Sequence, residues 1–286
     1  MVVGVCGYFG HRLTEVAQRC GARTHSIEGE WGRPLDPEAV RAACRQYQPK
    51  VLAFVHAETS TGVLQSPWPM VEAAREAGAL LLMDSVTSLG GCPVLLDQWG
   101  IDAAYSGTQK CVGGLPGLAP VSFSDRAVET VKARRQPVQS YYLDVPLLQR
   151  YWSPERMYHH TAAATLVYGL REAVRLIAAE GLEARWARHR RVSDAFRAGV
   201  RALGSRLLVN EEDHLPQLTT VCIPDGADDA ATRAELRTEW NIEIGGGLGP
   251  LKGKVWRVGL MGASCTPANA LTLLAALGQI LRRQGV

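Results

Sequence analysis

Three polar stretches follow apolar runs in the first half of the sequence and carry residue types that could do chemistry. They are HAETSTG at 56–62, MDSVTSLGG at 83–91 and YSGTQK at 105–110. In an open α/β sheet, ligands bind beyond the carboxyl ends of the strands, so side chains that directly follow buried strands share one crevice. Asp84 and Lys110 would bring a carboxylate and an amine to it. This pair suits pyridoxal phosphate, because a lysine can form the Schiff base while an aspartate keeps the pyridine nitrogen protonated.

Each of these residues also has an ordinary structural interpretation. A lone lysine after a strand is usually a solvated surface charge, and a lone aspartate usually caps a helix or holds a turn. The hydroxyl residues Thr59, Ser60 and Thr61 could merely hold a turn. Residue types and spacing alone therefore leave Lys110 open between a surface charge and an amine used for covalent chemistry.

A nucleotide-binding loop is a further alternative, in the opening stretch GVCGYFG at 4–10. Its glycines recur every third residue after an apolar run, but the spacing is GxxGxxG and the dinucleotide motif is GxGxxG. No acidic residue closes a second strand about 20 residues further on, as that motif requires. The stretch is therefore weak evidence for a dinucleotide site.

The adjacent histidines His159 and His160 in RMYHHT raise the question of a metal site. Consecutive side chains point in different directions on either a helix or a strand, and no acidic or cysteine cluster joins the pair in sequence. We therefore expect a structural or interface role and no bound metal.

The composition is that of an ordinary globular protein. With 31 Lys and Arg against 28 Asp and Glu, the 286-residue chain has a formal charge of +3, too small to indicate a nucleic-acid surface. The basic residues at 188–191 are typical of the solvated face of a helix. Seven cysteines without a CxxC pair favour free thiols. No apolar run approaches the length of a membrane span. From the small net charge and the short apolar runs, we expect neither a nucleic-acid nor a membrane partner.

The elements that must position the polar stretches alternate between strands and helices. Continuous apolar runs at 51–57 and 79–85 are typical of buried parallel strands. Between them, PWPMVEAAREAG predicts a helix that ends at Gly78. Two earlier helical patterns, HRLTEVAQRCGA and DPEAVRAACRQYQ, are separated by the strand-like RTHSI. This alternation predicts an α/β fold with a mainly parallel sheet.

The pattern changes after about residue 120. A long helical stretch at 165–203 is interrupted near Gly181. It is followed by the strand-like LTTVCIP, a helix around 229–240, the strand-like VWRVGL and a final helix from about Pro267 to Arg283.

This change also predicts the domain organisation. We expect a large cofactor-binding domain over 1–165, and a linker helix with a smaller C-terminal α+β domain over 166–286. The strand-like run VVGVCG directly follows Met1 and would normally lie inside a sheet with elements before it. We therefore expect the large domain to be incomplete at its N-terminus.

Several motifs together resemble one known family. They are HAETSTGVLQ, LLLMDSVTSLGG, GIDAAYSGTQKC, SPERMYHHT, EIGGGLGP and GKVWRVGLMG. Their order and character are similar to those of the alanine–glyoxylate and serine–pyruvate aminotransferases, which are fold-type I pyridoxal-phosphate enzymes of the class V group. The resemblance runs from Val2 to the last helix.

The resemblance implies roles for residues around the cofactor. Lys110 would be the Schiff-base lysine and would shuttle the proton of the transamination, while Asp84 would pair with the pyridinium nitrogen. Phe9 falls where the family places an aromatic ring, commonly tryptophan, stacked on the cofactor. Thr59 and Val86 would line the cofactor ring.

The resemblance also implies contacts with the phosphate and the substrate. Gln109 would lie near the phosphate, while Tyr158 and Thr161 would reach the phosphate of the neighbouring subunit's cofactor, which makes a homodimer part of the site. Arg257 would clamp the substrate α-carboxylate, a bidentate task suited to guanidinium. Without the resemblance, Arg257 would be an edge-strand charge and Tyr158 an amphipathic core residue.

The implied activity is transfer of an amino group from alanine or serine to glyoxylate or pyruvate, with pyridoxal phosphate as cofactor. The small-molecule partners would be small amino acids and 2-oxo acids. Members of the family occur in peroxisomes and mitochondria, and no signal in this sequence decides between those compartments and the cytosol.

One departure from the family pattern gives an alternative. Relatives have a substantial segment before the position of Met1, with a Ser-Gly-His type loop at a helix N-terminus that cradles the phosphate. Helix N-termini supply oriented N–H donors and a favourable dipole, so its loss would weaken cofactor binding. The alternative is a truncated, non-catalytic chain. A desulfurase or lyase on the same fold would need a mobile catalytic cysteine loop, and none of the cysteines lies in an obvious one.

Overall fold

The computed structural model describes all residues, 1–286, and contains a large and a small sheet. The large sheet has six strands in the order β2-β1-β3-β6-β7-β8, and neighbouring strands run parallel except for β7 and the edge strand β8. Its strands are β1 (Val2–Val5), β2 (His25–Glu28), β3 (Val51–Val55), β6 (Leu80–Asp84), β7 (Ala103–Tyr105) and β8 (Val121–Phe123). The predicted α/β fold with a mainly parallel sheet is confirmed.

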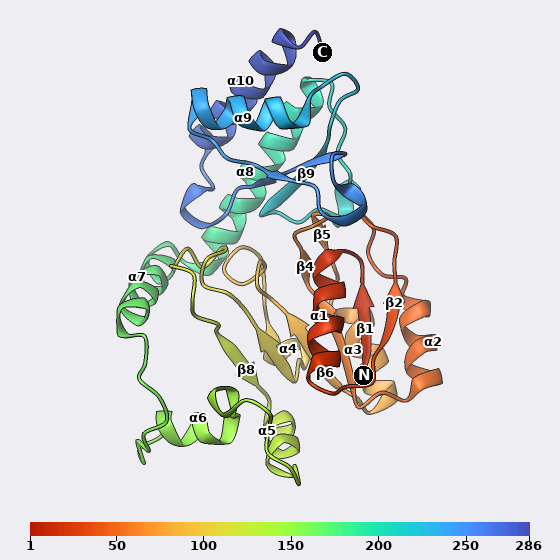
Figure 1. Cartoon of the computed structure of the whole chain (residues 1–286), viewed down its shortest axis with the longest axis vertical. Helices are drawn as coiled ribbons and strands as arrows, with labels where there is room; N and C mark the ends of the chain where they lie inside the picture. The colour runs from red at the N-terminus through yellow and green to blue at the C-terminus, as the bar shows by residue number, and fades with distance from the viewer.

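Alternate side chains of the central strands point to helices on opposite faces of this sheet. Phe54 and Met83 belong to a buried cluster that includes residues of α2 and α3, whereas Val3 packs in another cluster with Leu13 of α1. In Figure 1, α1 lies in front of the sheet and α3 behind it. Because both faces are covered, the strands appear in the sequence as continuous apolar runs. The three helices are α1 (Tyr8–Arg19), α2 (Pro37–Tyr47) and α3 (Trp68–Ala77).

The first helix begins earlier than the sequence pattern indicates. The helix α2 follows Asp36, whose carboxylate caps the helix locally, and the sequence pattern indicates where this helix starts. The helix α1 begins at Tyr8, whereas the helical sequence pattern starts only at His11. Its first N–H groups bind the side chains of Glu58 and Ser60, about 50 residues away. A cap so distant in sequence leaves no local signal.

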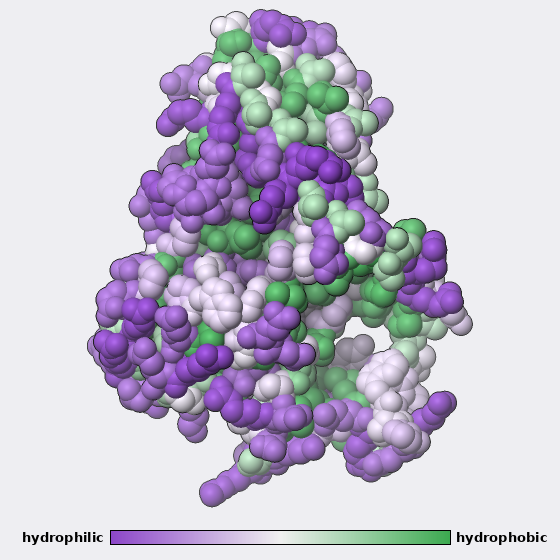
Figure 2. Space-filling view, turned by 180° about the vertical axis from the view of Figure 1, so that it is seen from behind, coloured by the Kyte–Doolittle hydropathy of each residue, from purple (hydrophilic) through white to green (hydrophobic).

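The segment after the large sheet forms helices with few buried side chains. They are α5 (Asp125–Lys132), α6 (Val145–Trp152) and the longer α7 (Ala164–Glu180), whereas the short α4 (Leu96–Trp99) lies between β6 and β7. α6 has no buried residue, and α7 buries only Ala173. Large hydrophobic side chains stay exposed on both, including Trp152 on α6 and Tyr168 on α7. Figure 2 shows hydrophobic residues around a hollow between these two helices.

The C-terminal part has its own core. α8 (Leu182–Ala202) follows α7 after Gly181, which has a φ of 83° and interrupts the helical stretch as predicted. Phe196 of α8, Trp256 and Ile280 belong to one buried cluster. The small antiparallel sheet has the order β10-β11-β9. The remaining elements are β9 (Leu218–Cys222), α9 (Asp229–Trp240), β10 (Gly245–Gly246), β11 (Val255–Gly259) and α10 (Pro267–Arg283). The hairpin of β4 (Ala57–Glu58) and β5 (Val63–Leu64) follows β3.

The domain boundary near residue 165 stays a prediction. The buried cluster that contains Phe54 and Met83 also includes Val209, which lies well beyond residue 165.

None of the helices has both the length and the apolar character needed to cross a membrane.

Gly10 sets how closely α1 approaches β1, because a Cβ at this position would lie 2.8 Å from Val5 Cα. We expect Gly10→Ala to push α1 away from the sheet and to lower the free energy of unfolding by about 1–3 kcal/mol, the usual cost of overpacking. Val16→Ala, on the exposed face of the same helix, should change it by less than about 0.5 kcal/mol. Urea denaturation measures both values, and equal effects would contradict this account of the contact.

Candidate active site

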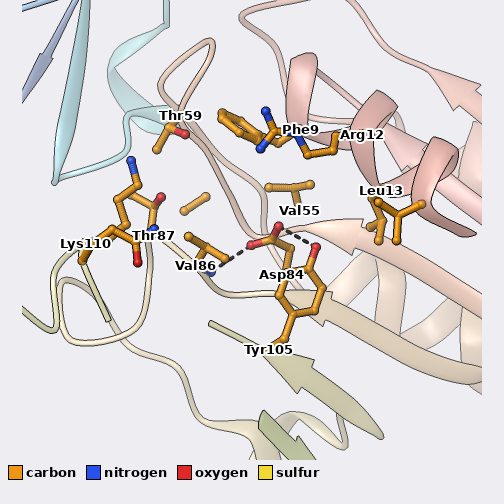
Figure 3. A pocket seen from close by; sticks show the side chains of 13 residues that line it. Phe9, Arg12, Leu13, Val55, Thr59, Asp84, Val86, Thr87, Tyr105 and Lys110 are labelled. Carbon is orange, nitrogen blue, oxygen red and sulfur yellow. Dashed lines mark hydrogen bonds between the residues drawn. The ribbon is translucent and has the colours of Figure 1, made fainter. Parts of the chain in front are cut away.

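A cavity of about 510 Å³ lies at the carboxyl ends of three parallel strands. Val55, Asp84 and Tyr105, the last residues of β3, β6 and β7, line it, and α1 contributes another wall. Figure 3 shows Asp84, at the end of β6, and Lys110, on the loop after β7, around this space. Six of the residues predicted for the site line the cavity: Phe9, Thr59, Asp84, Val86, Gln109 and Lys110.

The carboxylate of Asp84 has one hydrogen-bond donor on each oxygen. The Val86 N–H donates to Oδ1 at 2.8 Å, and the Tyr105 hydroxyl donates to Oδ2 at 2.7 Å (Figure 3). Burial raises the pKa of Asp84, although both hydrogen bonds and the charge of Arg12 oppose that rise. The Val86 contact holds a turn, as the ordinary interpretation expects, but the side chain also faces the cavity. A cation placed against it would favour its charged form.

Tyr105 is a cavity residue that the sequence motifs do not reveal. β6 and β7 are parallel neighbours, and their register pairs Asp84 with Tyr105. Paired residues point to the same face of a sheet, so two polar side chains at the ends of adjacent strands would have been the signal. Burial, and then the charge of Asp84, raises the pKa of Tyr105, so its hydroxyl remains a proton donor to Asp84.

Lys110 follows β7 and is partly buried at the cavity wall. Burial lowers the pKa of its amine, and the positive charge of Arg257 lowers it further. No carboxylate pairs with the amine, and a lowered pKa increases the neutral, nucleophilic fraction. These surroundings favour the amine used for covalent chemistry over the solvated surface charge.

The carboxylate of Glu58 occupies the N-terminus of α1, the helix that carries Phe9. The N–H groups of Phe9 and Gly10 donate to Oε2 at 3.1 and 3.2 Å, and the Ser60 N–H and hydroxyl donate to Oε1 at 2.9 and 2.6 Å. Glu58 is fully buried, and a Cβ at Gly7 would lie 2.5 Å from its Cγ. The nucleotide-loop alternative is therefore wrong, because a carboxylate already fills the place that a pyrophosphate would need.

Arg12 is a second cavity residue that the motifs do not reveal. It lies one helical turn after Phe9, and its guanidinium carbon is 4.9 Å from the centre of the Phe9 ring, a cation–π distance. The spacing of three residues along α1 is the signal that could have identified it. Arg12 brings a positive charge to the wall that faces Asp84.

Arg257 links the small sheet to the edge of the cavity. It lies on β11, the central strand of that sheet, so the edge-strand interpretation is wrong. Its Nε donates to the Gly246 carbonyl at 2.7 Å, and its Nη1 donates to the backbone carbonyl of Thr59 at 3.1 Å. Burial lowers the pKa of Arg257. These two contacts fix one side of the guanidinium and leave Nη2 available to a ligand.

The remaining predicted residues lie in an exposed segment before α7. Tyr158 and Thr161 do not line the cavity of their own chain, and their hydroxyl oxygens are 3.1 Å apart. Tyr158 is 73% exposed, so the core-residue interpretation is wrong. His159 and His160 contact each other through their Nδ1 atoms at 2.8 Å, and His159 stacks on Tyr141. No group of three or more potential metal ligands occurs in the chain.

Comparison with known proteins connects this geometry to one family. Residues 7–254 match the family model described as Aminotransferase class-V. The (S)-ureidoglycine–glyoxylate transaminase of Bacillus subtilis is 41% identical over 99% of this chain and 72% of that protein. The alanine–glyoxylate aminotransferase of Drosophila melanogaster is 37% identical over 99% of this chain and 73% of that protein.

Two solved structures have nearly the same fold. The alanine–glyoxylate aminotransferase of Nostoc sp. gives a TM-score of 0.96 at 50% identity, over 98% of this chain and 74% of that chain. The ureidoglycine–glyoxylate aminotransferase of Bacillus subtilis gives 0.97 at 43% identity, over 100% of this chain and 74% of that chain. The family model matches most of this chain, and the relatives are similar to it in sequence over nearly its whole length. The chain therefore belongs to the class V aminotransferase family.

Proposed function

We propose that this chain transfers an amino group from alanine or serine to glyoxylate or pyruvate, with pyridoxal 5′-phosphate as cofactor. The observation that carries the proposal is the convergence of Lys110, Asp84 and the ring of Phe9 on one cavity. Class V aminotransferases depend on this cofactor, and glyoxylate is the acceptor named for the relatives.

The residues around the cavity fit the cofactor. A volume of about 510 Å³ lies in the range of roughly 300–1,000 Å³ that is usual for cofactor sites. The buried Asp84 carboxylate suits a protonated ring nitrogen, and the Phe9 ring offers a face for stacking. The unpaired amine of Lys110 suits covalent attachment. Val86 would contact the ring, and the exposed Gln109 at the cavity wall would be near the phosphate.

The bound cofactor would supply an electron sink for the negative charge that develops at the substrate's α-carbon. Asp84 would hold the ring nitrogen in its protonated form, and Tyr105 would keep the carboxylate oriented. Lys110 Nζ would accept the proton lost from the α-carbon. Arg257 Nη2 would bind the substrate carboxylate while Nε and Nη1 stay on their carbonyl partners, which would orient the α-carbon toward Lys110.

No cysteine lines the cavity, so a cysteine-dependent lyase finds no support in the site. Burial raises the pKa of Cys6, Cys44, Cys92, Cys111 and Cys265, which disfavours the reactive thiolate in each.

We also propose that the chain works as a homodimer. Tyr158 and Thr161 lie outside the cavity of their own chain, and the hydrophobic side chains exposed on α6 and α7 lie in the same part of the molecule. A second copy packed there would cover that surface and bring the two hydroxyl groups to the neighbouring cavity.

The first test asks whether Lys110 binds the cofactor. Purified chain mixed with pyridoxal phosphate should develop a visible absorbance band that borohydride abolishes. Lys110→Ala should remove the band, because the amine is lost, while Lys132→Ala on the exposed end of α5 should keep it. Absence of the band from the unaltered chain would instead support the weakly binding, non-catalytic alternative.

The second test concerns the amino donor. Ureidoglycine is a second candidate, because it is the donor named for the Bacillus subtilis relative that is 41% identical. We expect kcat/KM for transfer to glyoxylate to be at least about tenfold higher with alanine or serine than with (S)-ureidoglycine, a difference of about 1.4 kcal/mol in transition-state binding. Steady-state kinetics with the three donors measures this ratio, and a ratio below one would make ureidoglycine the preferred donor.

The third test asks whether Tyr158 and Thr161 act across a dimer. Lys110→Ala and the double variant Tyr158→Phe/Thr161→Val should each have little activity when purified alone. Co-expression should restore part of it, because a mixed dimer contains one cavity with Lys110 from one chain and both hydroxyl groups from the other. Co-expression of Lys110→Ala with Asp84→Asn provides the control, since both changes damage the cavity of their own chain. Equal activity in the two mixtures would contradict the shared site.

A further inference from the structure

Two arginines and one glutamate form a partly buried cluster where α7 meets α8, which we call the Glu180 cluster: Glu180, Arg185 and Arg188. The Arg185 side chain donates from Nη1 to Glu180 Oε2 at 2.7 Å, and Arg188 donates to the same carboxylate from Nε at 2.5 Å and from Nη2 at 2.9 Å. The expectation of a solvated helix face at 188–191 is therefore wrong for Arg188. The two arginines hold the pKa of Glu180 down to about 2, so the carboxylate stays charged.

Arg185 uses its remaining donors on two loops that border the cavity. Its Nη2 donates to the Cys111 carbonyl at 2.8 Å, directly after Lys110, and its Nε donates to the Gly90 carbonyl at 3.0 Å, in the loop that follows Asp84. The side chain of Arg185 is 6% exposed. No backbone N–H donates to either carbonyl, so the guanidinium is the group that satisfies both.

Arg188 shares the carboxylate but serves another segment. Its Nη1 donates to the carbonyls of Gly262 and Cys265, at 3.0 and 2.7 Å, in the turn between β11 and α10. His189 also binds that turn, because its Nε2 accepts the Gly262 N–H at 3.0 Å. Arg188 therefore resembles Arg185 in charge and in its glutamate partner, and makes no hydrogen bond to the turn that carries Lys110.

The position of the Lys110 amine depends on the backbone beneath it, since no side-chain partner holds Nζ. We propose that Arg185 is a positioning residue for Lys110: by holding the carbonyls of Cys111 and Gly90, it fixes the Lys110 turn against the loop of Asp84. Removing the guanidinium leaves two buried carbonyls without a donor, a cost that the turn can relieve only by moving. The cofactor role of Lys110 in this inference rests on the proposed function, whereas the effect of Arg185 on the turn does not.

Hydrogen exchange of the cofactor-free chain tests the effect on the turn. The Gly113 and Gly114 amides donate within this turn to the carbonyls of Lys110 and Thr108, so their exchange reports on its order. Arg185→Met should speed exchange in a peptide over 106–114 at least about tenfold, and Arg188→Met should speed exchange over 260–266 instead. Unchanged exchange over 106–114 in Arg185→Met, or an equal increase in Arg188→Met, would overturn the proposal.

Arg185→Lys is a second variant that keeps the test decisive if Arg185→Met does not fold. Lysine keeps a positive charge for Glu180 but lacks the planar fork that reaches two carbonyls at once. We expect this variant to fold and to show faster exchange over 106–114. Exchange equal to that of the unaltered chain would overturn the proposal, whether or not Arg185→Met folds.

Cofactor binding can be measured separately from stability, because a loss of overall stability alone would not shift the pH midpoint of the visible band. If the unaltered chain forms the visible band with pyridoxal phosphate, Arg185→Lys should raise the Kd about tenfold and shift the pH midpoint of the band, because the amine is no longer held in place. Arg188→Met should leave both values unchanged. If the unaltered chain forms no band, the proposed function fails, and the exchange pattern still decides the role of Arg185. If the band forms and both variants match the unaltered chain, the positioning role fails.

Discussion

Glu58 carries a fully buried carboxylate whose two oxygens bind two segments that wall the cavity. One oxygen accepts the first N–H groups of α1 and so places the ring of Phe9, and the other holds the turn after β4 that contains Thr59. Burial raises the pKa of Glu58, and four N–H and O–H donors oppose that rise. Its charge also favours the protonated form of Arg257. A residue with no exposed surface thus holds two segments of the cavity wall and favours the positive charge at the cavity edge.

Positive charge predominates around the cavity. Arg12 and Lys110 line it, Arg257 reaches its edge through Thr59, and Asp84 is the acidic group that lines it. The positive charge of Arg257 adds to the effect of burial and lowers the pKa of Lys110 further. Such a cavity favours ligands that carry carboxylate or phosphate groups, and it keeps the amine of Lys110 closer to its neutral form than a surface lysine would be.

Elements with local signals could be predicted from the sequence. Apolar runs identified β3 and β6, Asp36 and Gly78 marked helix ends, and the polar residues after the strands gave Asp84 and Lys110. Residues that act through distant partners could not be predicted in the same way. Glu58 caps a helix almost 50 residues earlier, and Arg185 binds a carbonyl 74 residues earlier. Such contacts exist only after the chain has folded.

The link between the small sheet and the cavity passes through the main chain of Thr59, since Arg257 donates to its carbonyl oxygen. A backbone carbonyl is present whatever side chain the residue carries. The side chain at position 59, which lines the cavity, can therefore change without loss of the hydrogen bond from Arg257. The side chain that faces the cavity and the contact with the small sheet belong to one residue, yet they can vary independently.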